Sequence, residues 1–423
     1  MSDFVLKGHI CHSLSRNQLQ ILEDHYLVCV DDRCEGIYPV LPDIYRGLPL
    51  TDYGDRLIIP GMSDLHIHAP QFAFRGLGMD MELLDWLNAH TFPEESKYSD
   101  LEYADLAYGQ FVEHLRRSET TRVCIFATIH VPATELLMEK MEQSGLISCI
   151  GKVNMNRNCP DYYSEHATEN SVAQTRRWLE KTVGKWERTK PILTPRFTPT
   201  CTDDLMEALC SLRKEFNVPV QSHLSENLKE IAWVRELVPD ANNYADAYRK
   251  FGLLGGDHKC IMAHCVHLDE KEMAALKENG VFVAHSPESN MNVSSGVAPI
   301  SRYLDYGLQV GLATDVAGGS HESMFRAMTH AIQSSKLRWR LLDQSVKPLD
   351  FDTAFFLATR GGGAFFGKVG AFESGYELDA VVLDDRNLDH PQKLTVKERL
   401  ERIAYLGDDR NICGKYVGGT KLF

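Results

Sequence analysis

The chain lacks an excess of basic residues, long apolar runs and a basic leader segment. Its 423 residues carry a formal net charge of -14, which argues against nucleic acid or an anionic membrane as a main partner. No apolar stretch approaches the length of a transmembrane helix, and the first seven residues do not have the pattern of a secretory signal. We therefore expect a cytoplasmic protein with neither a nucleic-acid nor a membrane partner.

Paired cysteine motifs, short-period repeats and low-complexity linkers are absent as well. The eleven cysteines show no CxxC spacing, and their number is odd, which favours reduced thiols over a disulfide framework. Cys265, which follows a candidate site histidine, is interpreted as a small buried apolar residue. The hydrophobic content of 43% is ordinary for a globular protein, and the length allows a large core with a smaller accessory domain.

The middle of the chain alternates short apolar runs with amphipathic stretches. This pattern is typical of a parallel sheet with crossover helices. Eight such runs with helical segments between them predict an α/β fold, a (β/α)8 TIM-like barrel over residues 58–371. The expected strands are Leu57–His68, Thr121–Ala127, Ile147–Asn154, Pro191–Arg196, Val218–His223, Cys260–His264, Val281–His285 and Val310–Thr314.

Both ends of the chain differ from this middle part, because short half-buried strands alternate there with polar turns. Together they predict one small β-sandwich domain formed by residues 1–57 and 372–423. The expected strands are Phe4–Cys11, Tyr26–Val30, Gly36–Tyr38 and Leu378–Leu383, with a closing hairpin at Lys415–Thr420.

The segment Asp64–His68 (DLHIH) follows an apolar run and contains two histidines two residues apart. Side chains two apart on a strand point to the same side, so His66 and His68 present two imidazoles to one place. Two neutral imidazoles at a strand end are the beginning of a transition-metal site. In a barrel of the predicted kind, the carboxyl ends of the strands build the active site.

Two later strand ends supply further candidate ligands, His223 at the fifth and Asp315 at the eighth. Three imidazoles and one carboxylate suit a divalent metal that keeps one position open for water. We expect Zn²⁺, with Fe²⁺ as the alternative that this donor set leaves open. The fourth strand ends in Arg196, which cannot be carboxylated to bridge a second metal, and Lys152 is interpreted as structural. One metal per chain is therefore predicted.

Other polar residues at these strand ends are candidates for proton transfer. Glu226 follows His223 by three residues and is predicted to shuttle protons, although a glutamate there could also serve a helix N-terminus. His264 ends the sixth strand and could be a fifth ligand or could hold the attacking water; we favour the second role. His285 and His130 stay open between a site role and a structural one.

Seven short segments distributed over most of the chain form a characteristic set. They are Thr91–Pro93, Phe126–His130, Gly151–Val153, Thr194–Phe197, Gln221–Asn227, Thr314–Gly319 and Tyr405–Ile412. The HxH, SHxSE and TD elements resemble those of many deaminases of the amidohydrolase superfamily. The TPRF, TDVAGG and YLGDDRNI elements are more specific, and with them the chain closely resembles the guanine deaminase family.

The resemblance implies hydrolytic deamination of guanine to xanthine and ammonia through a metal-activated water, in purine catabolism and salvage, by a homodimeric enzyme. It implies that Glu226 moves protons, that His264 positions the water and that Asp315 accepts a proton. The metal ligands that it implies are His66, His68, His223 and Asp315.

The resemblance also implies how the base is recognised. Gln71, Arg196 and Phe197 match the family's purine-recognition positions, and His223, Glu226 and Asp315 are expected to face the base as well. Arg196 has five donors and no acceptor, which suits the carbonyl on carbon 6 and would reject adenine. Phe197 is expected to contact the base or else to pack the barrel rim. Pro70 stands where other members often have Ser or Gly, and it stiffens the loop before Gln71.

Two alternative functions remain at this point. One is another deaminase of the same superfamily, acting on cytosine, 8-oxoguanine or an S-adenosyl thioether. The other is a non-catalytic scaffold, since some proteins of this fold lack the metal ligands. The second is disfavoured because this chain has every candidate ligand and Glu226, and because the site rather than the fold decides function.

Overall fold

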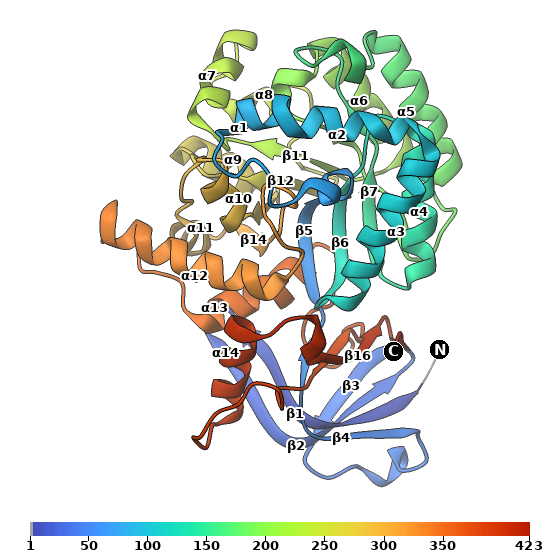
Figure 1. Cartoon of the computed structure of the whole chain (residues 1–423), viewed down its shortest axis with the longest axis vertical. Coiled ribbons are helices and arrows are strands. Elements are labelled where there is room, and N and C mark those ends of the chain that lie inside the picture. The colour runs from blue at the N-terminus through green and yellow to red at the C-terminus, as the bar shows by residue number, and fades with distance from the viewer. Residues whose placement is uncertain (1–2) are drawn as a thin grey trace.

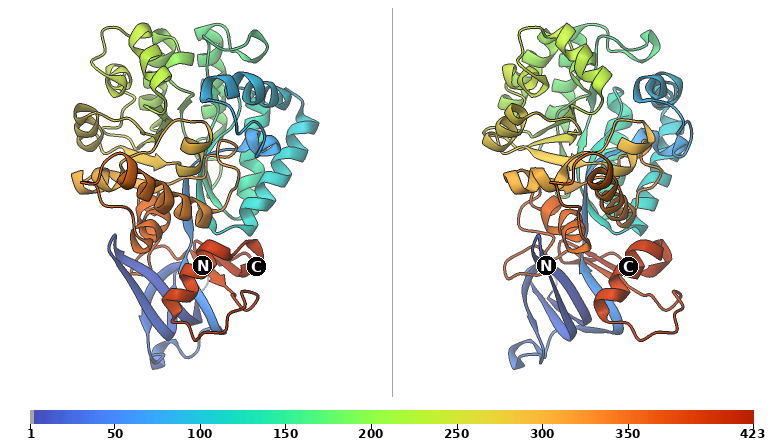
Figure 2. Two further views of the ribbon diagram at one scale, coloured as in Figure 1. Left: turned by 60° about the vertical axis from the view of Figure 1, so that its left-hand side comes forward. Right: turned by 90° about the vertical axis from the view of Figure 1, so that its left-hand side faces the viewer.

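The computed structural model describes residues 3–423, so the first two residues of the predicted segment 1–57 lie outside the described residues. Strands from both ends of the chain (blue and red) lie together at the bottom of Figure 1, and the parallel strands with their helices lie above them. The two views in Figure 2 show the same separation. The two chain ends are therefore neighbours in space.

A seven-stranded sheet combines strands from the two ends of the chain, in the order β17-β16-β15-β4-β1-β2-β3. Its centre is β4, which pairs parallel with β1 and antiparallel with β15. This pairing corrects the expected sandwich, because the N-terminal and C-terminal strands join edge to edge in one continuous sheet. The strands are β1 (Phe4–Ser15), β2 (Gln18–Val30), β3 (Arg33–Tyr38), β4 (Leu50–Pro60), β15 (Ala380–Leu383), β16 (Ile412–Val417) and β17 (Thr420–Lys421).

Parallel strands form the middle of the molecule in two four-stranded sheets, β5-β6-β7-β9 and β11-β12-β13-β14, with the pair β8 and β10 beside them. Each expected strand of the middle region has a counterpart here. The bounds are β5 (Met62–His68), β6 (Thr120–Phe126), β7 (Ile147–Gly151), β8 (Val153–Asn154), β9 (Thr189–Pro191), β10 (Thr194–Pro195), β11 (Val220–Leu224), β12 (Cys260–His264), β13 (Phe282–His285) and β14 (Gln309–Leu312).

Hydrogen bonds connect these two parallel sheets at both of their edges. Leu193, between β9 and β10, bridges to Val220 of β11. On the other side, the Asp315 N–H donates to the His66 carbonyl at 2.9 Å, and the His68 N–H donates to the Val316 carbonyl at 3.1 Å. The carboxyl ends of β5, β11 and β14, which carry the candidate ligands, are thereby brought to one side of the molecule.

The expected first strand, Leu57–His68, is divided at Gly61. Residues up to Pro60 belong to the seven-stranded sheet, and residues from Met62 onward belong to the parallel strands. A side chain at Gly61 would collide with Thr121 at the start of β6. The continuous apolar run thus covers two strands, because it is buried in two different sheets.

Helices cover the outside of the parallel strands, as the alternating pattern predicts (Figure 1). Two of the longer ones, Leu101–Arg117 and Asp203–Phe216, have an amphipathic sequence and turn their apolar side inward. The helices of the described residues are α1 (Leu83–Trp86), α2 (Phe92–Ser96), α3 (Leu101–Arg117), α4 (Val131–Ser144), α5 (Thr168–Thr182), α6 (Asp203–Phe216), α7 (Leu228–Leu237), α8 (Tyr244–Lys250), α9 (Glu270–Glu278), α10 (Pro287–Asn292), α11 (Ile300–Tyr306), α12 (Met324–Leu341), α13 (Phe351–Phe356) and α14 (Val396–Leu406). Of these, α14 lies beside the seven-stranded sheet (Figure 1).

A buried ion pair ties the seven-stranded sheet to the parallel strands. Arg122 on β6 donates from Nε to Asp379, just before β15, at 2.8 Å and from Nη2 to Glu377 at 2.7 Å. Arg122 and Asp379 are both almost fully buried. Because a buried charge is tolerated only when it is paired, this contact fixes how the two parts of the chain meet.

Within residues 3–423, no helix is both long enough and apolar enough to cross a membrane. All eleven cysteines are free in the structure, and ten of them are buried or half-buried. This agrees with the prediction that they do not form a disulfide framework. Cys265 is fully buried, as expected for a small apolar side chain.

Candidate active site

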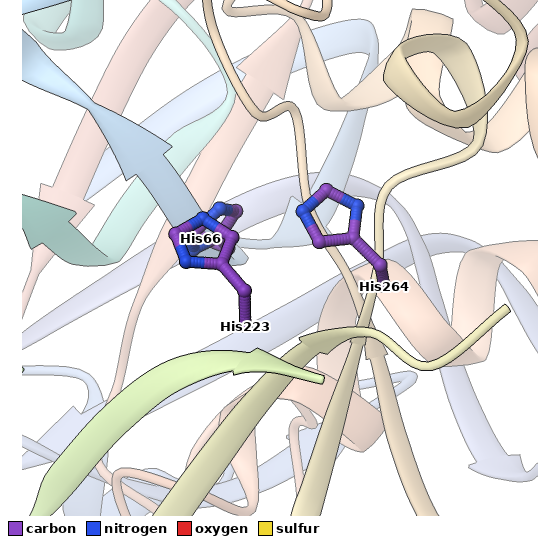
Figure 3. Close-up of side chains that lie close together, drawn as sticks. All are labelled: His66, His223 and His264. Carbon is purple, nitrogen blue, oxygen red and sulfur yellow. The ribbon is translucent and has the colours of Figure 1, made fainter. Parts of the chain in front are cut away.

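The four candidate metal ligands converge at the carboxyl ends of β5, β11 and β14. The Nε2 atoms of His66 and His68 are 3.1 Å apart, and the Nε2 atom of His223 lies 3.3 Å from that of His68. Asp315 places Oδ1 3.1 Å from His66 Nε2 and 3.4 Å from His68 Nε2. The rings of His66 and His223 overlap in the view of Figure 3, with the ring of His264 beside them, and the ring centroid of His66 lies 4.8 Å from that of His223 and 5.4 Å from that of His264.

These spacings fit a bound divalent metal. Ligand atoms at 2.0–2.1 Å from a tetrahedral zinc ion lie about 3.4 Å from one another. Without a cation, several imidazole nitrogens that face each other cannot all find a hydrogen-bond partner. The tautomer of His223 also fits a metal ligand. Its Nδ1 donates to the Arg196 carbonyl at 2.5 Å, which leaves the Nε2 lone pair turned toward the cluster.

The electrostatics of the cluster give each residue the protonation state that a metal ligand needs. Burial lowers the pKa of His66, His68 and His223, so their imidazoles are neutral and offer lone pairs. Burial alone would raise the pKa of Asp315, but the adjacent His66 and His264 more than offset it and hold the pKa far below its usual range. The site therefore presents three neutral imidazoles and one carboxylate.

Asp64 joins the strands that carry the ligands. Its carboxylate accepts from the His66 N–H at 3.2 Å and from the Thr314 N–H at 3.1 Å. Thr314 also donates its hydroxyl to the same carboxylate. Because Asp64 is fully buried, these bonds fix the distance between β5 and the residue that precedes Asp315.

His264 ends β12, and the side chain of Asn290 orients its ring. Its Nδ1 is 2.9 Å from the Asn290 side-chain oxygen, which directs Nε2 toward Glu226 Oε2 at 3.5 Å and Asp315 Oδ2 at 3.7 Å. Burial disfavours its charge, but these two carboxylates outweigh burial and raise the pKa of His264. His66, His223 and His264 together also bring ligand atoms within 4.8 Å of one another, so both roles considered for His264 are within its reach.

Glu226 is held at the mouth of the site by the residues around it. Asn227 caps α7, and the Glu230 side chain accepts from the N–H groups of Glu226 and Asn227 at 3.0 and 3.1 Å. The hydroxyl of Ser295 donates to Glu226 Oε1 at 3.0 Å. Burial raises the pKa of Glu226 to about 7, which suits a group that takes up and releases protons near neutrality.

A cavity of about 430 Å³, including its opening to solvent, connects these groups with the predicted base-recognition residues. Its polar side contains the candidate ligands other than His66, which is fully buried and does not line the cavity. Its apolar side comes from α1, the residue after it and the loops opposite. The lining residues are His68, Gln71, Leu83, Trp86, Leu87, Arg196, Phe197, His223, Glu226, His264, Ser289, Val293 and Asp315.

Comparison with known proteins agrees with this geometry. The pattern of the Amidohydrolase family matches residues 57–422. The guanine deaminase of Dictyostelium discoideum is 36% identical over 99% of this chain and 98% of its own, and that of Mus musculus is 39% identical over 99% and 96%. The crystal structure of guanine deaminase from C. acetobutylicum with bound guanine in the active site is 43% identical, covers 100% of both chains and superposes with a TM-score of 0.96.

The chain belongs to the guanine deaminases of the amidohydrolase family. The assignment extends over almost the whole sequence, so it includes both the parallel strands and the sheet built from the two chain ends. It agrees with the resemblance that the sequence motifs indicate.

One residue that sequence reasoning missed binds two of the predicted base-recognition residues, Gln71 and Arg196. Glu95 on α2 is fully buried. It accepts from Arg196 Nη1 at 2.7 Å and Nη2 at 3.2 Å, from Gln71 Nε2 at 2.8 Å and from the Tyr163 hydroxyl at 2.8 Å. The motif Thr91–Pro93 stops two residues short of it, and the second of two consecutive glutamates after a proline gives no signal of burial.

The other polar residues considered from the sequence lie outside the cavity lining. Lys152 is fully buried and forms an ion pair with Glu165, which agrees with a structural lysine. His130 precedes α4 and lies near Tyr163, with ring centroids 5.8 Å apart. His285 is buried at the end of β13, and burial lowers its pKa to about 3. A neutral, buried His285 suits a structural role.

Proposed function

We propose that this chain hydrolyses guanine to xanthine and ammonia. The observation that carries the proposal is a single cavity with a metal-ligand cluster and Glu226 on one side and the donors of Gln71 and Arg196 on the other. Guanine offers a carbonyl to such donors and an amine on carbon 2 to the hydrolytic side. The relatives that match almost the whole chain are named guanine deaminases, which supports the same reaction.

The residues that would hold the metal are His66, His68, His223 and Asp315, and their neutral imidazoles and ionised carboxylate fit a divalent cation. When bound, the metal would supply Lewis-acid activation of a water molecule. We propose Zn²⁺, with Fe²⁺ as the alternative that the same donors accept. One metal is proposed because Arg196 stands at the fourth strand end, where a second metal would need a carboxylated lysine.

The proposed proton transfers belong to Glu226, Asp315 and His264. Asp315 accepts a proton from the attacking water. Glu226, with a pKa raised to about 7 by burial, delivers its proton to ring nitrogen 3. It then takes the proton of the new hydroxyl group on carbon 2 and passes it to the departing amine, which leaves as ammonia, and the proton held by Asp315 returns to Glu226. His264, oriented by Asn290, holds the water by donating or accepting at Nε2.

Base recognition is assigned to Gln71, Arg196 and Phe197. The guanidinium of Arg196 donates to the carbonyl on carbon 6, a contact that adenine cannot make. Phe197 lines the cavity next to His223, with ring centroids 6.4 Å apart, and this position supports the proposal that it contacts the flat face of the base.

The remaining architectural proposals rest on the strand pairing and on the family resemblance. We propose that residues 58–371 close into a (β/α)8 barrel, supported by the hydrogen bonds that link both edges of the two parallel sheets. Residues 1–57 and 372–423 are proposed as a separate β domain, supported by their shared sheet. A homodimer in the cytoplasm stays a prediction.

The test is guanine turnover by the purified chain, with xanthine and ammonia both measured and metal content determined on the same sample. Stoichiometric formation of the two products is expected. Adenine, cytosine and 8-oxoguanine serve as comparison substrates, because they distinguish guanine deamination from related activities. Absence of xanthine formation by metal-loaded protein would reject the proposed function.

A further inference from the structure

The Glu95 carboxylate is the centre of a buried polar group beneath the recognition side of the cavity. Each of its oxygens receives two donors, Oε1 from Arg196 and Gln71, and Oε2 from Arg196 and Tyr163. Arg196 is 2% exposed and Glu95 is 0% exposed. Burial disfavours the Arg196 charge, but Glu95 outweighs burial and raises the pKa of the guanidinium. The bidentate geometry fixes the guanidinium plane.

Glu95 also determines which way the Gln71 amide is turned. The Gln71 nitrogen donates to Glu95 at 2.8 Å, and the Gln71 oxygen accepts from the Ala317 N–H at 3.2 Å. The opposite orientation would place N–H against N–H and oxygen against carboxylate, so partner chemistry excludes it. The Gln71 oxygen thus accepts a hydrogen bond from the backbone. The amide nitrogen keeps a second N–H group, which is a donor.

We propose that Glu95 is a positioning residue that selects substrates with a carbonyl group, by holding Arg196 and Gln71 as donors toward the cavity. This inference rests on the proposed function. A carboxylate is the group that accepts from all its neighbours at once. It therefore sets both the place and the hydrogen-bond polarity of the two residues that meet the base. Glu95 does not line the cavity itself, so it acts through Arg196 and Gln71.

The substitution Glu95→Gln tests the role with little change in shape. Arg196 donates to both carboxylate oxygens, so whichever way the new amide is turned, its NH₂ group faces an Arg196 N–H. The guanidinium must then move. We expect kcat/KM for guanine to fall by about tenfold to a hundredfold, the effect of a misplaced orienting group, while metal content stays the same.

A matched control is available on the same helix. Glu94 pairs with Lys97 and Tyr103 on the other side of α2, so Glu94→Gln makes the same chemical change away from Arg196. We expect Glu94→Gln to keep the wild-type kcat/KM and Glu95→Gln to lose it. Equal losses in both variants, or wild-type efficiency in Glu95→Gln, would overturn the positioning role.

A second readout separates positioning from a general loss of structure. Hypoxanthine has the carbonyl on carbon 6 and purine lacks it, and neither has an amine on carbon 2, so both are tested as competitive inhibitors of guanine turnover. Wild type and Glu94→Gln should prefer hypoxanthine, and Glu95→Gln should lose most of that preference. No preference in the wild type, or an undiminished preference in Glu95→Gln, would contradict the inference.

If Glu95→Gln does not accumulate as folded protein, Tyr163→Phe answers the same question. It removes one donor from Glu95 and keeps the ion pair, so the preference for hypoxanthine should drop by a few-fold. An unchanged preference would overturn the inference. If the wild type does not convert guanine at all, the proposed function is rejected. If the wild type converts guanine and Glu95→Gln converts it equally well, only the role of Glu95 is rejected.

Discussion

Replacing Glu226 with Gln should remove proton transfer and leave the surrounding structure unchanged. Glu226 is 4% exposed and accepts from the Ser295 hydroxyl at 3.0 Å. A glutamine can keep that bond through its carbonyl oxygen. Its NH₂ group then takes the place of Oε2, which lies 3.5 Å from His264 Nε2, and it cannot carry a proton between water and substrate.

The size of the loss follows from this change of chemistry. A positioned general acid or base contributes roughly a hundredfold to ten-thousandfold in rate. That range corresponds to about 2.7–5.5 kcal/mol of activation free energy. We expect the decrease mainly in kcat, because the residues proposed to contact the base elsewhere in the cavity are unchanged.

The assay is steady-state formation of xanthine, with metal content and melting temperature measured on the same preparation. Ser295→Ala is the matched control, because it keeps the Glu226 carboxylate and removes one hydrogen bond to it. One such bond contributes about 1 kcal/mol, which is roughly fivefold in rate. If Glu226→Gln keeps its metal and works within tenfold of wild type, Glu226 is not the proton shuttle.

Three further predictions concern recognition, the metal and the contact between the two parts of the chain. Arg196→Met should lower kcat/KM for guanine by roughly five- to 150-fold, from the loss of about 1–3 kcal/mol of hydrogen bonding, with metal content unchanged; unchanged efficiency would refute the binding pose. Elemental analysis of active protein should give one divalent metal per chain, and chelation should abolish turnover until Zn²⁺ is restored; two tightly held metals, or none, would contradict the single site. Arg122→Met should lower the free energy of unfolding in urea by about 3–5 kcal/mol, because it leaves Asp379 buried without its cation; a change below about 1 kcal/mol would show that the ion pair is not needed.

The order of strands and candidate ligands could be read from the sequence. Apolar runs separated by amphipathic stretches give the parallel strands, since the hydrophobic pattern reflects burial on both faces. The spacing of His66 and His68 places both side chains on one face of β5, because a strand alternates its sides at every residue. Local motifs also identify Glu226 next to the start of α7, where Asn227 and Glu230 form a capping box.

Tertiary structure alone decided how distant segments meet. The division of the first expected strand at Gly61 depends on Thr121, a residue that is remote in sequence. The edge-to-edge joining of the two chain ends through β4 depends on which strand edges are free, and hydrophobic patterning does not specify that.

The sequence also gives no indication of the proposed role of Glu95, which rests on donors from three other segments. Its sequence neighbours give no sign of burial, whereas Arg196 is 101 positions away and binds it with two hydrogen bonds. A charge can be buried only where the fold supplies a partner. The sequence therefore determined which residues carry the chemistry, and the fold determined which of them are fixed and in what orientation.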